Sequence, residues 1–211
     1  MSKQKEARIA RKTPKQARSR KMVSWILDAA TRVFEEYGYA GATTNHIANK
    51  AGVSIGSLYQ YFPNKEALLT TVAMQHLEEG KAVTEKLLTN VIETNLPLDA
   101  LLKALIKEFI AQHEQNPRLH RLLFEEAPLP EIVWQAYRDF IKEGVTKVSF
   151  LLDSHPEVKV LHTAMAAYML VHTLESLAHQ LIIHPPEDFS IEESMNEFVD
   201  LFMAYRTRQE T

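Results

Sequence analysis

The segment 54–62, SIGSLYQYF, carries polar side chains of the kinds that read a nucleic acid. The amide of Gln60 can donate and accept a hydrogen bond at once, which is the bidentate geometry that suits adenine. Gly56 removes a side chain where a helix would have to approach a duplex closely. Hydroxyl groups suited to phosphate oxygens or to single hydrogen bonds come from Ser57, Tyr59 and Tyr61. This composition is typical of a helix that lies in a major groove.

Two short amphipathic segments would have to position these side chains, one on either side of Gly52. Segment 45–51 has apolar residues at helical spacing, and the second segment places Leu58 and Phe62 four residues apart on one face. Candidate N-cap residues precede both segments, namely Thr43, Thr44 and Ser54. The pattern predicts a helix-turn-helix, although hydrophobic spacing alone is equally typical of an ordinary hairpin of two helices.

The residue order resolves this ambiguity in favour of DNA binding. The run TTNHIANKAGVSIGSLYQYFPNKEALL resembles the DNA-binding domain of the TetR family of transcription regulators, whose pattern is T-x-x-x-I-A-x-x-A-G-V-S-x-G-x-L-Y-x-Y-F. The resemblance covers about residues 20 to 70. It implies base contacts from Ile55, Gly56, Ser57 and Gln60. It implies phosphate contacts from Thr43, Thr44, Ser54, Tyr59, Tyr61 and Lys65.

Charge is distributed unevenly along the 211 residues, whose formal net charge is -3. Up to Lys65 there are 12 basic and 4 acidic residues, whereas 12 basic and 23 acidic residues follow. A basic end on an acidic remainder is typical of a protein that places that end on a polyanion. Residues 1–19 are rich in Lys and Arg and poor in apolar residues, and we expect a basic flexible arm there that adds affinity for DNA.

A first helix is predicted from about Ser19 to Tyr37, and it ends at Gly38. It completes a three-helix DNA-binding domain over residues 20–65, with Trp25, Phe34 and Tyr37 expected in its core. Pro63 and Asn64 then open a long helix that continues to about Thr89. Lys65 opposes the dipole of that helix in its first turn, so an external phosphate is the better explanation for its charge.

The rest of the chain, residues 66–211, is expected to be helical throughout. Breaks that contain proline separate apolar-periodic segments at about 98–115, 117–126, 130–153, 156–183 and 190–208. The predicted fold class is therefore all-α. The resemblance implies that this part is a C-terminal domain for effector binding and dimerisation.

The last two predicted helices carry one apolar side each, and the resemblance implies that they pair with those of a second protomer. The candidate interface is formed by Val171, Glu175, Ala178, His179, Ile182, Met195, Phe198, Val199 and Phe202. A core within one protomer is the alternative. Dimerisation makes physical sense because one recognition helix reads only a few base pairs.

An apolar effector cavity is expected among the middle helices. Its candidate lining combines apolar and amphipathic side chains from Phe109, His113, Phe124, Trp134, Tyr137, Met165 and Tyr168. For each residue taken singly, ordinary core packing explains the pattern as well.

Metal binding and catalysis have weaker support. His172, Glu175 and His179 could bind zinc, but they span nearly two turns, so hydrogen bonding at a dimer interface explains them better and no metal or cofactor is expected. The chain lacks cysteine, a nucleophile elbow and a phosphate-binding glycine loop, so we expect no enzyme. No apolar run approaches the roughly 18 residues that cross a bilayer, so the protein is expected in the cytoplasm and not in a membrane.

Together these features predict a dimeric transcription repressor that binds a palindromic double-stranded operator. A small, largely apolar effector would release it from DNA. An architectural or non-specific DNA-binding protein without an effector is the alternative.

Overall fold

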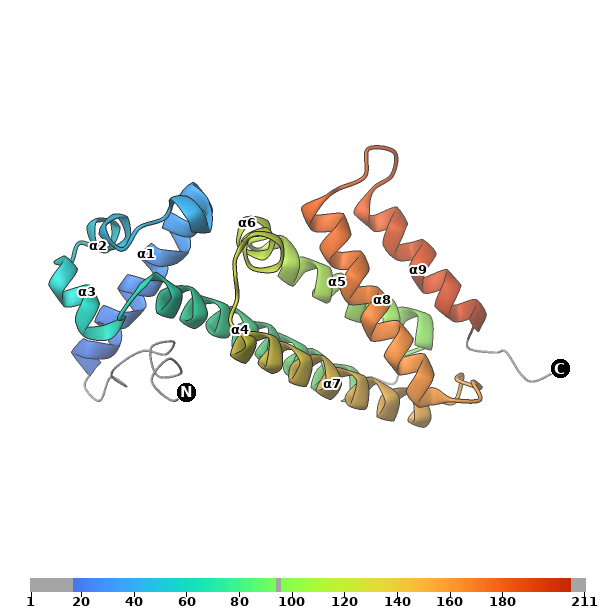
Figure 1. Cartoon of the computed structure of the whole chain (residues 1–211). Coiled ribbons are helices and arrows are strands. Elements are labelled where there is room, and N and C mark those ends of the chain that lie inside the picture. Colours follow the sequence, from blue (N-terminus) through green and yellow to red (C-terminus); the bar gives the residue numbers. More distant parts are fainter. Residues whose placement is uncertain (1–16, 94–95, 206–211) are drawn as a thin grey trace. The chain divides into compact units, whose positions relative to one another are not determined.

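The computed structural model describes residues 17–93 and 96–205, and Figure 1 shows that helices form its regular structure. No strand occurs within these two ranges, so the all-α prediction is confirmed. The predicted basic arm falls almost entirely outside them, as do residues 206–208 of the last predicted helix. Two compact units are present, described here as the N-terminal unit (residues 17–78 and 118–136) and the C-terminal unit (residues 79–117 and 137–205).

The N-terminal unit is built from α1 (Ala17–Gly41), α2 (Thr44–Ala51), α3 (Ile55–Tyr61) and the beginning of α4 (Lys65–Glu93). It also contains most of α6 (Pro117–Arg121), the π-helical turn η2 (Leu122–Glu126) and the start of α7 (Glu131–Ser154). One apolar cluster joins these pieces, and its largest buried members are Phe34, Phe62, Ile26, Ile47, Leu58, Leu68 and Leu69. The unit thus extends beyond the three-helix domain expected at residues 20–65.

Side chains at the helix ends confirm the predicted helix-turn-helix. The Thr43 hydroxyl accepts a hydrogen bond from the His46 backbone N–H at 3.1 Å and so caps α2. The Ser54 hydroxyl accepts from the Ser57 N–H at 3.0 Å and caps α3. Between them, Gly52 adopts the left-handed conformation with φ 67°, which glycine reaches without steric cost.

Two details of α1 differ from the prediction. The element continues to Gly41 across a kink at Gly38, where φ is 65° and ψ is 172°. Phe34 is fully buried as expected, but Trp25 is 52% and Tyr37 49% exposed, so the prediction that they belong to the core is wrong. Both aromatic rings contact polar neighbours at the surface, Trp25 beneath the Lys21 ammonium group and Tyr37 beside the His46 ring.

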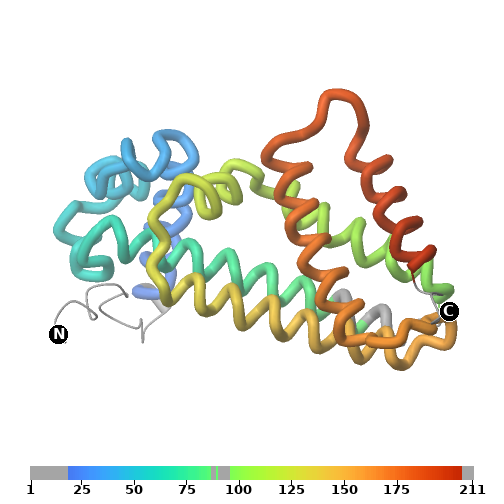
Figure 2. Tube along the Cα trace, turned by 45° about the vertical axis from the view of Figure 1, so that its right-hand side comes forward, coloured from blue at the N-terminus to red at the C-terminus, as the bar shows by residue number. Residues whose placement is uncertain are grey.

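The C-terminal unit contains the rest of α4 and α7 together with α5 (Leu98–Glu114), α8 (Thr163–Ile183) and α9 (Ile191–Tyr205). Within it, α4 and α7 run side by side, and α8 and α9 form an antiparallel pair (Figure 1, Figure 2). Ion pairs join the first two helices, with Lys147 Nζ 3.6 Å from Glu85 and Lys81 Nζ 3.5 Å from Glu143. Helix α5 packs against α8 and α9, and a second apolar core lies among them.

Helix α8 begins later than the expected residue 156. The chain before it is not helical, and Glu157 accepts a hydrogen bond from the Leu98 N–H at 3.2 Å. That contact caps the start of α5, where Pro97 offers no capping side chain. The residues before α8 therefore cap the start of α5 and do not form an additional turn of α8.

None of the helices in residues 17–93 and 96–205 is both long enough and apolar enough to span a membrane.

Candidate functional site

Helix α3 presents one polar face to solvent because its other face is anchored in the core. Leu58 and the following Phe62 are completely buried. The opposite side leaves Ile55, Tyr59 and Gln60 exposed. The predicted base-reading residues thus lie together on one accessible surface, the α3 surface, which we define as residues 54–61.

Gly56 has no function that the interior of the protein explains. Its φ is not positive, and a Cβ built at this position would meet only the Ser54 hydroxyl at 3.9 Å. Neither backbone strain nor internal packing therefore requires glycine there. A close approach by a molecule outside the protein does account for it, as the sequence suggested.

Hydroxyl groups around α3 are linked in short hydrogen bonds. The Tyr59 and Thr44 hydroxyls lie 3.0 Å apart, and Ser19 donates to the Tyr61 hydroxyl at 3.1 Å. The Ser54 and Ser57 hydroxyls are 2.8 Å apart. These contacts hold predicted phosphate-binding groups from α2 and α3 on a common surface. Each hydroxyl keeps capacity to bind a further oxygen.

Lys65 has partners inside the protein. Its ammonium group donates to the backbone carbonyls of Tyr39 at 2.6 Å and Ala42 at 2.8 Å, and lies 4.3 Å from the centre of the Tyr39 ring. A cation is favourable beside the carbonyls at the end of α1. These partners lie outside the helix that Lys65 opens, and they explain its charge without an external phosphate.

A second candidate site is an apolar cavity in the C-terminal unit between α4, α5, α7 and α8. It holds about 830 Å³ of empty space, which includes its open mouth. Its polar lining groups are Thr84, Gln112 and Glu175. Its apolar lining comes from Val83, Leu102, Leu105, Ile106, Phe109, Phe140, Ile141, Gly144, Val148, Leu170, Val171 and Leu174.

The predicted pocket residues are not all at this cavity. Phe109 lines it, and His113 is buried nearby on α5, with Nδ1 2.8 Å from the Phe109 carbonyl. Met165 and Tyr168 are exposed on α8 and do not line it. Phe124 and Trp134 belong to the N-terminal unit, where their rings meet edge to face. Aromatic composition alone did not distinguish the residues around a cavity from those of a core.

The sequence placed Glu175 at a dimer interface. In the structure its side chain is buried, only 8% exposed, and lines this cavity. Tyr137, one turn of α7 away from Phe140, donates its hydroxyl to Glu175 Oε1 at 2.9 Å. Burial raises the pKa of the Glu175 carboxyl to about 7, because the charged form loses its hydration, and the Tyr137 hydrogen bond opposes the rise. A sequence signal existed, since Glu175 is the sole Asp, Glu, Lys or Arg of α8.

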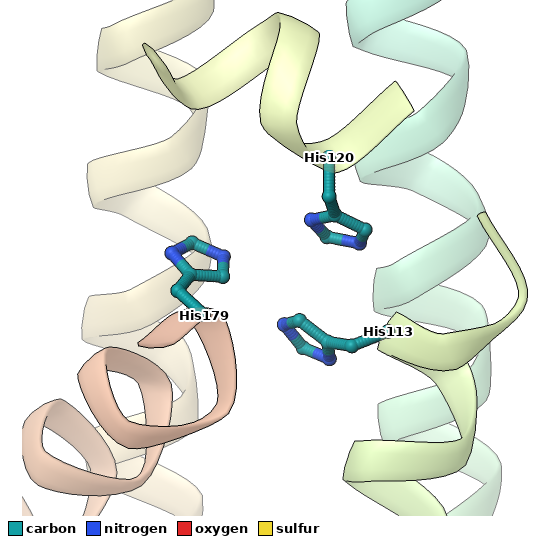
Figure 3. Close-up of side chains that lie close together, drawn as sticks. All are labelled: His113, His120 and His179. Carbon is teal, nitrogen blue, oxygen red and sulfur yellow. The ribbon is translucent and has the colours of Figure 1, made fainter. Parts of the chain in front are cut away.

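Histidines surround this carboxyl on one side. His179 Nε2 lies 3.6 Å from Glu175 Oε1, and Figure 3 shows the rings of His179 on α8 and His113 on α5 turned toward each other, with centres 5.3 Å apart. His120, also labelled there, belongs to the N-terminal unit and has Nε2 3.0 Å from that of His76. His172 is exposed beside the Tyr168 ring, so it does not join Glu175 and His179 as the zinc hypothesis required.

Most of the predicted interface residues are buried within the C-terminal unit itself. They pack into its core, and they include Ala178, Phe198, Val199 and Phe202. Val171 lines the cavity with Glu175, while Ile182 and Met195 are half-buried against the same core. The exposed apolar side chains of these two helices are instead Met165, Tyr168, Met169 and Leu201. A shallow groove between α8 and α9 carries Met169 and Leu201 on its walls.

The α3 surface and the helical C-terminal unit define the class as helix-turn-helix transcription regulators. Residues 26–72 match the bacterial regulatory proteins of the tetR family, and residues 97–205 match the tetracyclin repressor-like C-terminal domain. The chain belongs to the TetR family. The resemblance noted in the sequence is therefore confirmed.

Relatives agree with this assignment. The regulator PksA of Bacillus subtilis is 33% identical over 149 residues, which cover 69% of this chain and 71% of PksA. The regulator UidR of Escherichia coli K12 is 26% identical, over 56% of this chain, and the match spans 66% of UidR. Both are transcription regulators and not enzymes, which agrees with the expectation from the sequence.

Solved structures share the fold. A TetR-family regulator from Mesorhizobium loti has a TM-score of 0.72 at 23% identity, with 90% of this chain and 98% of that chain covered. FadR of Bacillus subtilis, solved in complex with stearoyl-CoA, has a TM-score of 0.65 at 21% identity, and the match covers 86% of this chain and 97% of the FadR chain.

Proposed function

We propose that this chain is a dimeric, ligand-responsive repressor that works in the cytoplasm and binds a palindromic operator with two α3 surfaces. The observation that carries the proposal is Gly56, whose lack of a side chain has no internal reason and sits at the centre of an exposed polar helix face. Gln60 supplies the bidentate group for a base. Hydroxyls of Thr44, Tyr59 and Ser54 supply the neighbouring phosphate contacts.

Dimerisation through α8 and α9 would place two such surfaces on one operator. The support is the exposed apolar set of Met165, Tyr168, Met169 and Leu201, together with the groove between the two helices. Isologous pairing would bury this set against its copy, which removes apolar area from water. The interface of this proposal therefore uses the outer faces of α8 and α9, whereas the sequence pointed to their inner faces.

The apolar cavity supports an effector site in the same protomer. Four helices contribute to its wall, and one of them, α4, continues as a single helix from the recognition unit. An effector that binds better to a form with poor operator affinity would release the DNA. By linkage, operator DNA must weaken effector binding by the same factor.

A selection of bound duplexes from a random DNA pool, with the mass of the protein recorded in solution, tests this proposal. A recovered palindrome and a dimeric mass are expected. Recovery of duplexes without a shared sequence would contradict the operator proposal and favour an architectural DNA-binding protein.

Gln60→Ala tests how the operator is read. The variant should lose discrimination at one base pair of each half-site, by about 1 to 3 kcal/mol, because the bidentate contact is gone. Tyr59→Phe is the contrasting variant, since loss of a phosphate contact should weaken binding to all sequences alike. An unchanged preferred site for Gln60→Ala would remove Gln60 from base reading.

A further inference from the structure

The wall of the cavity in the C-terminal unit has an unusual charge composition. Among the described residues that line it, Glu175 is the one charged side chain. Thr84 and Gln112 are neutral, and the remaining lining is apolar. A ligand in this cavity would therefore meet hydrocarbon on most sides and a carboxyl group at one place.

Glu175 is held in a defined position and keeps one oxygen available. The Tyr137 hydroxyl and His179 Nε2 both approach Oε1, at 2.9 and 3.6 Å. Within residues 17–93 and 96–205, no hydrogen bond or ion pair reaches Oε2. A carboxylate buried in apolar surroundings is costly unless a positive or hydrogen-bonding group compensates it.

The protein does not supply that positive charge from the cavity wall. The nearby lysines, Lys81 of α4 and Lys147 of α7, are committed to an ion-pair network with Glu143 and Glu85. No Lys or Arg of the described chain lines the cavity. Tyr137 and His179 approach Oε1, so a positively charged partner for Oε2 would have to come from a ligand.

We propose that the effector is an amphipathic amine, with an apolar body that fills the cavity and a basic nitrogen that binds Glu175 Oε2. This inference rests on the proposed function of the cavity as the effector site. A protonated amine would donate a charge-assisted hydrogen bond to the carboxylate, which is stronger than a bond between neutral groups. A carboxylic acid of the same length would place like charges together, and an alcohol would donate a hydrogen bond but bring no positive charge to the carboxylate.

Proton uptake and release follow from the same geometry. The groups that face Glu175 are Tyr137 of α7 and His179 of α8, with His113 of α5 against His179, while α4 contributes the neutral Thr84. Burial holds the carboxyl partly protonated at neutral pH, with a pKa of about 7. An ammonium group at Oε2 favours the ionised form, so the amine should bind more tightly as the pH rises through about 7, where alkylamines remain protonated.

Calorimetric titration of the full chain with decylamine, decanol and decanoic acid tests the proposal. We expect decylamine to bind at least about tenfold more tightly than decanol or decanoic acid near pH 8. In Glu175→Gln, which preserves an acceptor for Tyr137, the preference for the amine should disappear. Glu108→Gln removes the same charge from an exposed position on α5 and should retain the preference.

Three outcomes would overturn the proposal. They are equal or weaker binding of the amine in the wild-type protein, an amine affinity that does not rise with pH, and an unchanged preference in a folded Glu175→Gln variant. The wild-type comparisons decide the matter even if the variant fails to fold. The DNA selection is independent of all three, so a recovered palindrome without amine binding would reject this inference and leave the operator proposal intact.

Discussion

At the scale of single residues, Glu175 shows how one side chain acquires two properties from its surroundings. Its burial in apolar surroundings raises the pKa of the carboxyl, and its position places it on the wall of the cavity. A folded protein that contains such a group is less stable whenever the group has to be charged.

The pH dependence of unfolding tests this burial. In the folded protein the pKa of Glu175 is about 7, above the ordinary value of 4.5, so its contribution to folding is most favourable below the ordinary value and is lost as the pH rises to about 7. The Glu175→Gln variant has no carboxyl at this position, so it does not lose this stability as the pH rises. The difference in free energy of unfolding between the variant and the wild type should therefore shift in favour of the variant by about 2 to 3 kcal/mol between about pH 5 and pH 8.

Urea unfolding at both pH values measures this change. Glu108→Gln is the control, because Glu108 is exposed. The free energy of unfolding of this variant should differ from that of the wild type by the same amount at both pH values. A flat difference for Glu175→Gln would mean that the carboxyl is not buried in solution.

Lys65 is the second residue whose role is set by its contacts. Lys65→Met should lower the free energy of unfolding of the N-terminal unit by about 1 to 3 kcal/mol, because the carbonyls of Tyr39 and Ala42 lose their shared donor. Urea unfolding without DNA measures the effect. Lys50→Met breaks an exposed ion pair with Glu36 at 3.3 Å and should change stability little. Equal stability of the wild type and Lys65→Met would return Lys65 to a role in phosphate binding alone.

At the scale of elements, α2 and α3 are each too short to be stable alone and depend on their caps and on buried anchors. Thr43 and Ser54 satisfy N–H groups at the two starts, and Ile47, Leu58 and Phe62 fix the two helices in the core. Because the caps and the buried residues hold the two helices, substitutions on the outer face of α3 should not affect the fold.

Gly56→Ala separates folding from DNA binding. Alanine favours a helix over glycine by about 1 kcal/mol, and the added methyl group meets no atom closer than 3.9 Å, so stability should hold or rise. Operator affinity should fall by at least about tenfold, because the methyl group occupies space that the duplex needs. The measurement is a pair of titrations, one with denaturant and one with operator.

Gly52→Ala is the contrasting variant, because it should reduce stability, which Gly56→Ala should not. Its φ of 67° disfavours alanine, so this variant should lose stability. Undiminished operator binding by a stable Gly56→Ala would exclude a close approach of DNA at α3.

At the scale of the whole molecule, the proposed function requires the C-terminal unit both to enclose a ligand and to pair with a copy. Its inner faces are suited to the first task, since Glu175 and Leu174 line the cavity and Phe198 and Val199 fill the core. Its outer faces carry the exposed apolar residues. Helix α8 is apolar on both sides, and the proposal assigns a different task to each side.

Leu201→Glu tests the outer faces as the dimer interface. The side chain is 69% exposed in the protomer, so folding should tolerate the charge, whereas two glutamates in a self-complementary contact would repel each other and lose apolar burial. We expect the mass in solution to fall from dimer to monomer, and operator affinity to fall with it.

The matched control is Phe150→Glu on α7, where the side chain is 67% exposed and lies on another element. This variant should remain dimeric. A dimeric Leu201→Glu protein would place the contact between protomers elsewhere.

The sequence by itself determined the helical fold, the caps at Thr43 and Ser54, and the surface-exposed residues of α3. Each depends on residues that are close in the chain, where spacing and local hydrogen bonds decide the outcome. Tertiary structure alone decided the partner of Lys65, the exposure of Trp25 and the separation of cavity from core. It also turned Glu175 toward a cavity, because a helix that is apolar all round does not reveal which side each neighbour covers.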